Sequence, residues 1–154
     1  MQLVLSMLVI IITRVAIVYI VTLIEPFKIA RLPLIALSFA WGIVSFLIAD
    51  VTQSTIIGTY QVPVYMVSLV IAPPLEEFLM MIFPIWLYHF TLARYSGDGM
   101  VYGFAVGSGF ALAESIAYVI GTPDQALSIA LSRVISVGLV HASIAGIVAA
   151  GVCG

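Results

Sequence analysis

Residues 100–120 read MVYGFAVGSGFALAESIAYVI, and Glu114 is the only charged side chain among them. A helix that crosses the hydrocarbon core of a bilayer needs about 20 consecutive, mainly apolar residues. This stretch has that length and composition, so it predicts a membrane-spanning helix rather than the amphipathic helix of a water-soluble domain.

The whole 154-residue chain shares this apolar character. Hydrophobic residues make up 64% of it and charged residues 8%, whereas about 25% of the residues of an ordinary soluble domain are charged. Such a chain has too little polar surface to cover a water-soluble globule, which excludes a cytosolic enzyme, a disordered tail and a secreted disulfide scaffold. There is no basic cluster, so nucleic acid is not expected as a partner. Cys153 is the only cysteine, which excludes an internal disulfide.

We therefore predict an all-α, polytopic transmembrane helix bundle embedded in the lipid bilayer as a single domain, residues 1–154. Five spans are expected, at about residues 3–24, 32–49, 73–90, 100–120 and 127–152. Residues 50–61 are expected to form a polar loop, and residues 94–99 a tight turn.

The third apolar region has a break in its middle. Residues 62–90 are too many for one straight span at about 1.5 Å per residue, and the region contains Pro73 and Pro74. Proline is accepted in the first turn of a helix, so the third span is expected to start at one of these prolines. Glu76 and Glu77 would then lie in its first turn.

The loop charges predict an orientation. Lys28 and Arg31 precede the second span, and Arg94 falls on the same side after two more crossings, whereas Asp50 and Asp124 fall on the opposite side. Cytoplasmic loops carry the excess of Lys and Arg. A multi-pass protein of the cell membrane is therefore expected, with its N-terminus outside and its C-terminus in the cytoplasm.

Several ionisable residues lie inside the apolar segments: Arg14, Glu76, Glu77, Glu114 and His141. A charged side chain in the hydrocarbon costs about 2.5–3.5 kcal/mol on insertion scales. Such residues either pair with one another for structural reasons or form a functional site. Three carboxylates and a histidine on three different spans favour a site.

Helical spacing indicates where these side chains point. Gly103 and Gly107 share one face of the fourth span with Glu114, and two small residues at this spacing let another helix approach closely. The last span has a similar small-residue face, which contains Gly138, His141, Ala142, Ala145 and Gly146. We therefore expect Glu114 and His141 to point toward a common interior.

Three stretches carry a family resemblance: APPLEE at residues 72–77, GFAVGSGFALAE at residues 103–114, and Arg133 with His141 and Gly146. Together they resemble the PrsW family of intramembrane proteases, which is more distantly similar to the CAAX-prenyl proteases. The resemblance covers residues 72–151. It implies a multi-span peptidase that cuts a membrane-anchored protein, such as an anti-sigma factor, near the external face.

By position, the resemblance assigns Glu76 and Glu77 to the double-glutamate motif, Phe110 and Glu114 to a Phe-x-x-x-Glu motif, and His141 to the family histidine. On this hypothesis Glu76 is the general base that activates a water, and Glu77 is its proton-sharing or orienting neighbour. His141 orients the water or stabilises the oxyanion, and Glu114 tunes the site. The same four residues would hold Zn²⁺ or another divalent metal if one is used.

Two positions depart from the family pattern. Met80 stands where a Lys is frequent, and Ala145 stands where an Asp is frequent. A missing cation partner could be supplied by Arg14 or Arg133. The departures leave open a catalytically inactive relative that binds peptides. A proton- or cation-coupled carrier is the other alternative, because buried Glu and His chains also serve as proton relays.

Overall fold

The computed structural model describes residues 2–24, 30–90, 92–93 and 95–153, without the side chain of Ile135. These residues form helices and their connections, and no strand is present among them. The elements in chain order are α1 (Gln2–Ile24), α2 (Leu32–Tyr60), α3 (Val64–Met66), the π-helical turn η1 (Val67–Ile71), α4 (Ala72–His89), α5 (Ser96–Gly121), the 3₁₀ turn η2 (Pro123–Gln125), α6 (Ala126–Ile135) and α7 (Val137–Cys153). Five helical segments are long and apolar enough to cross a membrane, which confirms the predicted all-α polytopic bundle.

The loop expected at residues 50–61 is wrong, because α2 continues to Tyr60. The polar side chains do not interrupt the helix. Thr52 and Thr55 donate their hydroxyl hydrogen bonds to the carbonyls of Ile48 and Val51, one turn earlier. The helix ends where Gln61 adopts the left-handed conformation (φ 52°), just before Pro63.

As predicted, α4 begins at the proline pair, with Ala72 as its first residue, but the residues before it are helical as well. Residues 64–89 form one continuous helical segment, whose η1 part is a π-helical turn that closes with the Ala72 N–H donating to the Val67 carbonyl. The wider turn directly before the prolines provides the room that their rings need against the preceding carbonyls. As a result, and contrary to the prediction, Glu76 and Glu77 lie inside the span and not in its first turn.

The turn expected at residues 94–99 is also shorter than predicted, because α5 begins at Ser96. Asp98 lies in its first turn, where an acidic side chain is favourable at the positive end of the helix dipole. Lys28 and Arg94, which entered the predicted orientation, lie outside the described residues.

The last span, predicted at about residues 127–152, lies within one span-length helical segment, residues 123–153, but this segment has a local interruption that the sequence did not predict. α6 ends at Ile135 and α7 begins at Val137, with Ser136 between them. At this point the Arg14 side chain of α1 donates hydrogen bonds to carbonyls at the end of α6.

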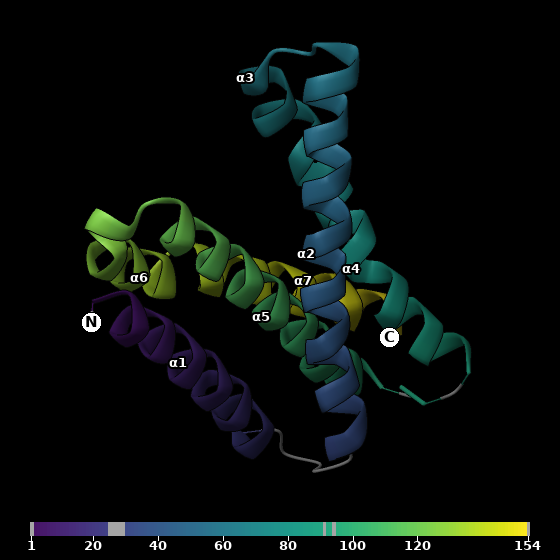
Figure 1. The fold of residues 1–154 in the computed structure, drawn as a ribbon. Helices are drawn as coiled ribbons and strands as arrows, with labels where there is room; N and C mark the ends of the chain where they lie inside the picture. Colours follow the sequence, from purple (N-terminus) through teal and green to yellow (C-terminus); the bar gives the residue numbers. More distant parts are fainter. Residues whose placement is uncertain (1, 25–29, 91, 94, 154) are drawn as a thin grey trace.

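α5 is the central helix of the bundle (Figure 1), and α1, α2 and α7 pack against it. Glycines permit this packing at backbone distance. A Cβ at Gly103 or Gly107 would overlap the carbonyl oxygen of Ala145 or His141 on α7. On the α2 side a Cβ at Gly109 would overlap the Phe39 carbonyl. The small-residue face predicted on the fourth span therefore brings α7, and His141 with it, against α5.

Candidate active site

Both oxygens of the Glu114 carboxylate face a basic side chain. Arg133 Nη2 lies 2.6 Å from Oε1, and His141 Nε2 lies 3.6 Å from Oε2. The three residues come from α5, α6 and α7, and the side chains of Glu114 and Arg133 are 18% and 13% exposed. Of the two cations that the sequence offered as partners, Arg133 is the one that pairs with a glutamate here.

His141 lies between two carboxylates. Its Nδ1 is 4.0 Å from Oε1 of Glu77 on α4, while its Nε2 faces Glu114. The ring packs against Phe110, with centroids 5.1 Å apart, and Phe110 is fully buried. An imidazole held in this way can accept a proton on one edge and release one from the other.

The adjacent side chains of Glu76 and Glu77 contact different residues. Consecutive residues of an α-helix point in directions about 100° apart, so Glu76 and Glu77 cannot face the same partner squarely. Glu77 faces His141, whereas Oε1 of Glu76 accepts a hydrogen bond of 2.9 Å from Nε2 of Gln53 on α2. Glu76 therefore points to a different side of α4.

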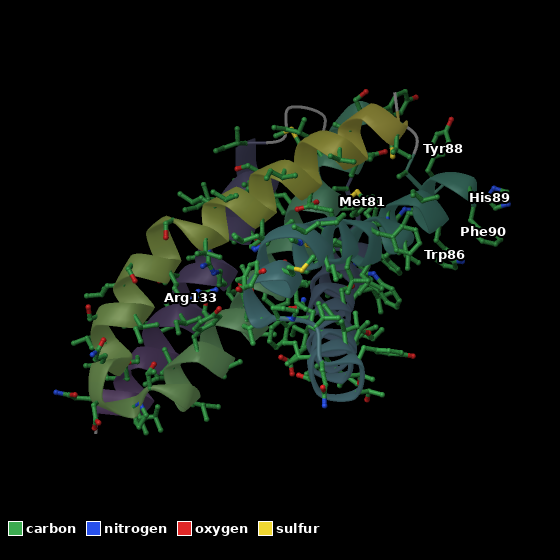
Figure 2. All side chains as sticks on the ribbon, turned by 90° about the horizontal axis from the view of Figure 1, so that it is seen from above. Met81, Trp86, Tyr88, His89, Phe90 and Arg133 are labelled. Atoms are coloured by element: carbon green, nitrogen blue, oxygen red, sulfur yellow. The ribbon has the colours of Figure 1, made fainter. Side chains whose placement is uncertain are left out.

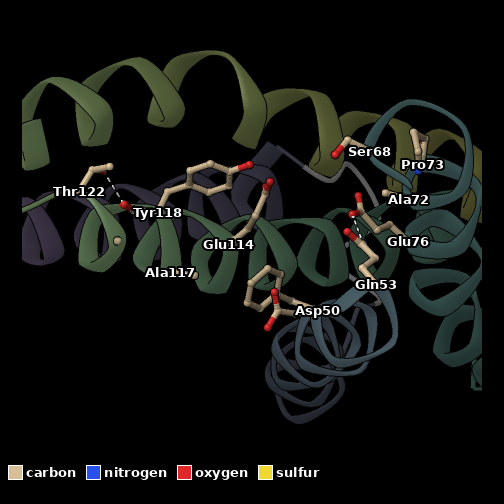
Figure 3. A pocket seen from close by; sticks show the side chains of 12 residues that line it. Asp50, Gln53, Ser68, Ala72, Pro73, Glu76, Glu114, Ala117, Tyr118 and Thr122 are labelled. Atoms are coloured by element: carbon tan, nitrogen blue, oxygen red, sulfur yellow. Dashed lines mark hydrogen bonds between the residues drawn. The ribbon is translucent and has the colours of Figure 1, made fainter. Parts of the chain in front are cut away.

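A cavity of about 470 Å³ lies between α2, the η1–α4 segment and α5. Figure 3 shows that the carboxylates of Glu76 and Glu114 both line it, with Asp50 and Gln53 from α2 and Tyr118 from α5. This volume lies within the range of about 300–1,000 Å³ that is usual for ligand sites. Two carboxylates from different helices thus share one space that a water and a peptide group can enter.

Gln53 and Tyr118 were not predicted from the sequence. Gln53 was assigned to a loop, and a neutral amide in a polar stretch gives no signal of function. The Arg133 guanidinium lies over the Tyr118 ring, 3.9 Å from its centroid. Tyrosine is common where membrane helices meet the interface, so the sequence could not distinguish a tyrosine that contacts Arg133 from an ordinary interfacial one.

Met80 and Ala145, the two departures from the family pattern, belong to one buried cluster with Phe110 and Val106. Both are 0% exposed. A Lys and an Asp at these positions would lie in the same part of the core. This chain therefore carries no buried charge at either position, and a single charged side chain at one of them would be buried without an opposite charge at the other.

The described residues do not form a metal-ligand set as they lie. A catalytic zinc site needs about three protein ligands around one point, and no three His, Cys, Asp or Glu side chains among the described residues meet in that way. The geometry at His141 gives the reason, because Glu77 and Glu114 approach two different ring nitrogens. One ion binds only one of these nitrogens, so this arrangement of side chains does not fit a single metal ion.

The aromatic end of α4 lies away from this site. Figure 2 shows Trp86, Tyr88, His89 and Phe90 together at the end of α4, far from Arg133. All four are exposed. This position fits the interfacial role expected for aromatic residues at a membrane surface and gives no support to His89 as a ligand.

Comparison with known proteins identifies one family. A family model described as PrsW family intramembrane metalloprotease matches residues 30–153. Neither the curated proteins nor the solved structures give a match.

Proposed function

The chain belongs to the PrsW family of intramembrane peptidases, and on that premise we propose that it cleaves a membrane-anchored protein with a water activated by Glu76. The observation that carries this proposal is the cavity that Glu76 and Glu114 line together. Within the part of the chain that the structure describes, the neutral amide of Gln53 donates a hydrogen bond to Glu76, and Glu114 is paired with a guanidinium. Two carboxyl groups in such different environments are suited to different roles in acid–base chemistry.

In the proposed reaction a water in the cavity donates a proton to Glu76 as its oxygen attacks the carbonyl carbon of the substrate. The carbon–nitrogen bond then breaks, and the proton passes from Glu76 to the leaving amine. Gln53 holds Glu76 toward the cavity, and its amide has a second N–H that can donate to the developing oxyanion. Glu76 thus acts first as a general base and then as a general acid.

Three further side chains support the proposed role of Glu76 without contacting the water: Glu114, His141 and Glu77. Arg133 pairs with Glu114 and holds its carboxylate at the cavity wall. The Glu77 carboxylate lies 4.0 Å from Nδ1 of His141, too far for a hydrogen bond, so its charge rather than a hydrogen bond would favour this orientation of the imidazole. His141 Nε2 in turn lies 3.6 Å from the second oxygen of Glu114.

We place the cavity on the external side of the membrane. The Arg31 N–H donates to the Tyr102 hydroxyl near the start of α5, and Thr122 at the cavity lies about 30 Å further along this helix at 1.5 Å per residue. The hydrocarbon core is also about 30 Å thick. With Arg31 on the cytoplasmic side, the cavity opens outside, the N-terminus is external and the substrate is cut near its external end. A membrane-anchored anti-sigma factor is a substrate of this kind.

Cleavage by the purified protein in lipid vesicles tests the proposal. The substrate is a single-span protein with a label on each side of the membrane, and the variants are Glu76→Gln and Asp124→Asn. We expect Glu76→Gln to abolish cleavage with an unchanged thermal unfolding profile. Asp124→Asn removes an exposed carboxylate outside the cavity and should leave cleavage unchanged. Full activity of Glu76→Gln would refute the role of Glu76, and co-purification of uncut substrate with the wild type would identify an inactive relative.

A further inference from the structure

The break between α6 and α7 has a specific partner. In a continuous α-helix the carbonyls of Arg133 and Val134 would accept the N–H groups of Val137 and Gly138, four residues on. Here both carbonyls accept the side chain of Arg14 instead. Nη2 lies 2.9 Å from the Arg133 oxygen, and Nη1 lies 3.4 Å from the Val134 oxygen. The guanidinium thus takes the place of the two missing backbone donors.

The surroundings of Arg14 favour its contact with the carbonyls at the end of α6. The residue is 1% exposed, although it lies inside an apolar span. Gly138 provides the space, because a Cβ there would overlap all of the guanidinium's terminal atoms. The carbonyl end of a helix also carries a partial negative charge, which suits a buried cation. A long basic side chain, a glycine and a helix end therefore fit one another.

The break has a consequence for the site. Arg133 and His141 are eight residues apart, which in a continuous helix means about 12 Å along the axis and about 80° around it. Nevertheless, Arg133 and His141 approach the two oxygens of one carboxylate, that of Glu114. At the interruption the Ser136 N–H still donates to the Ser132 carbonyl and the Val140 N–H to the Ser136 carbonyl. We therefore infer that a local distortion at Ser136, rather than a separation of the two helices, lets both side chains face the same group.

We propose that Arg14 is a positioning residue of the active site. It holds the break between α6 and α7 open and thereby sets Arg133 and His141 against Glu114. Arg14 belongs to α1, which lies outside the segment that matches the family. Its effect on turnover rests on the proposed peptidase mechanism, whereas its effect on the backbone does not.

The kinetic test uses Arg14→Met, Arg14→Lys and Gly138→Ala, with Ser6→Ala as the control. Ser6 is buried in α1 like Arg14, but its hydroxyl donates to the Gln2 carbonyl of its own helix and, among the described residues, to no other element. We expect Arg14→Met to lower kcat about 100-fold, the scale of a misplacement of about 1 Å, with little change in KM. Arg14→Lys should recover part of the loss. Gly138→Ala should reproduce it with Arg14 still present, and Ser6→Ala should match the wild type.

Amide hydrogen exchange in lipid nanodiscs tests the backbone directly. Without the guanidinium, the carbonyls of Arg133 and Val134 are free to accept Val137 and Gly138, so exchange of these two amides should become slower in Arg14→Met. A side chain that merely stabilises the fold would make exchange faster when it is removed. If Arg14→Met does not fold, Arg14→Lys and Gly138→Ala carry the test. If Arg14→Met has the kcat of the wild type and its amides exchange at an unchanged or faster rate, the inference is overturned. If exchange slows in Arg14→Met but the wild-type protein itself cleaves nothing, the peptidase mechanism alone is refuted.

Discussion

Glu114 shows how far single residues could be predicted. Like Glu76, Glu77 and His141, it was predicted to be a site residue because it is an ionisable group in an apolar span. Placing such a group in the membrane costs free energy unless it has a function or a partner. The structure brings all four into one region, with Arg133 paired to Glu114. Gln53 escaped prediction because a neutral amide carries no such cost. Its importance depends entirely on the neighbour that it reaches across the bundle.

Gln53 provides a prediction at this scale. Replacing it with leucine removes the hydrogen bond to Glu76, and hydrogen bonds to charged groups contribute about 1.5–3 kcal/mol. We expect Gln53→Leu to lower kcat by about 10- to 100-fold in the vesicle cleavage assay. Thr52→Val is the matched control, since the Thr52 hydroxyl binds only the carbonyl of Ile48. Equal rates for the two variants would remove Gln53 from the mechanism.

Metal removal gives a second prediction from the side-chain geometry. Because Glu77 and Glu114 face different nitrogens of His141, the site as it lies does not gather three ligands from the described part of the chain. We expect cleavage to persist after dialysis against a strong chelator, with metal content followed by mass spectrometry. Loss of cleavage that returns on addition of Zn²⁺ would show that the four residues rearrange around an ion.

At the scale of helices, the glycine spacing of α5 and most helix ends were readable from the sequence, whereas the end of α2 and the interruption between α6 and α7 were not. The Gly103 and Gly107 spacing predicts close packing, and both residues meet backbone atoms of α7. The polar stretch after residue 49 has no proline before Pro63, and its threonines satisfy their hydroxyls locally. Polarity alone therefore suggested a loop where the backbone remains helical.

Alanine at Gly107 tests the close contact of α5 with α7. A Cβ there would lie 2.7 Å from the Ala142 Cα and overlap the His141 carbonyl. Overpacking of this kind costs about 1–3 kcal/mol, so we expect a lower unfolding temperature in detergent and reduced cleavage, because His141 is displaced. Gly151→Ala on α7 is the control, since nothing lies within 4 Å of its Cβ. It should be neutral or stabilising by up to about 1 kcal/mol.

Charged substitutions at Met80 and Ala145 give another prediction, for the contact region of α4 and α7. Met80→Lys alone places an unpaired cation in a fully buried cluster, and an uncompensated buried charge costs about 3–5 kcal/mol. We expect this variant to unfold at a markedly lower temperature. Adding Ala145→Asp should recover a substantial part of the loss. A double variant no more stable than Met80→Lys would show that the two positions do not pair.

For the whole molecule, composition was enough to predict a five-span bundle, and the orientation rested on few charges. The break in the last span could not have been predicted, because it depends on Arg14, which is 119 and 120 residues away from the carbonyls that it binds. No local pattern around Ser136 indicates it. Local sequence predicts that a segment is long and apolar enough to cross the membrane, whereas side chains far away in the sequence affect where its helix is interrupted.

The orientation is testable with single cysteines in a Cys153→Ser background. The N-out arrangement predicts that a membrane-impermeant maleimide added outside intact cells labels Thr122→Cys and leaves Arg31→Cys unlabelled. Thr122 is exposed at the cavity, and Arg31 lies at the start of α2. The opposite labelling pattern would invert the topology and place the cavity in the cytoplasm.

The glycine contacts of α5 have one more consequence, for how the enzyme adapts to its substrates. α5 touches its neighbours at backbone distance on two sides, through Gly107 toward α7 and Gly109 toward α2. A rotation of α5 about its axis would bring its backbone into the carbonyl oxygens of α7 and α2, so we expect the backbone at Glu114 to keep its position. The opposite cavity wall includes Ser68 of η1, and no described glycine of η1 brings it to backbone distance from a neighbouring helix. Selectivity for the size of a substrate should therefore evolve through changes in η1, while α5 remains the invariant wall against which each new substrate is held.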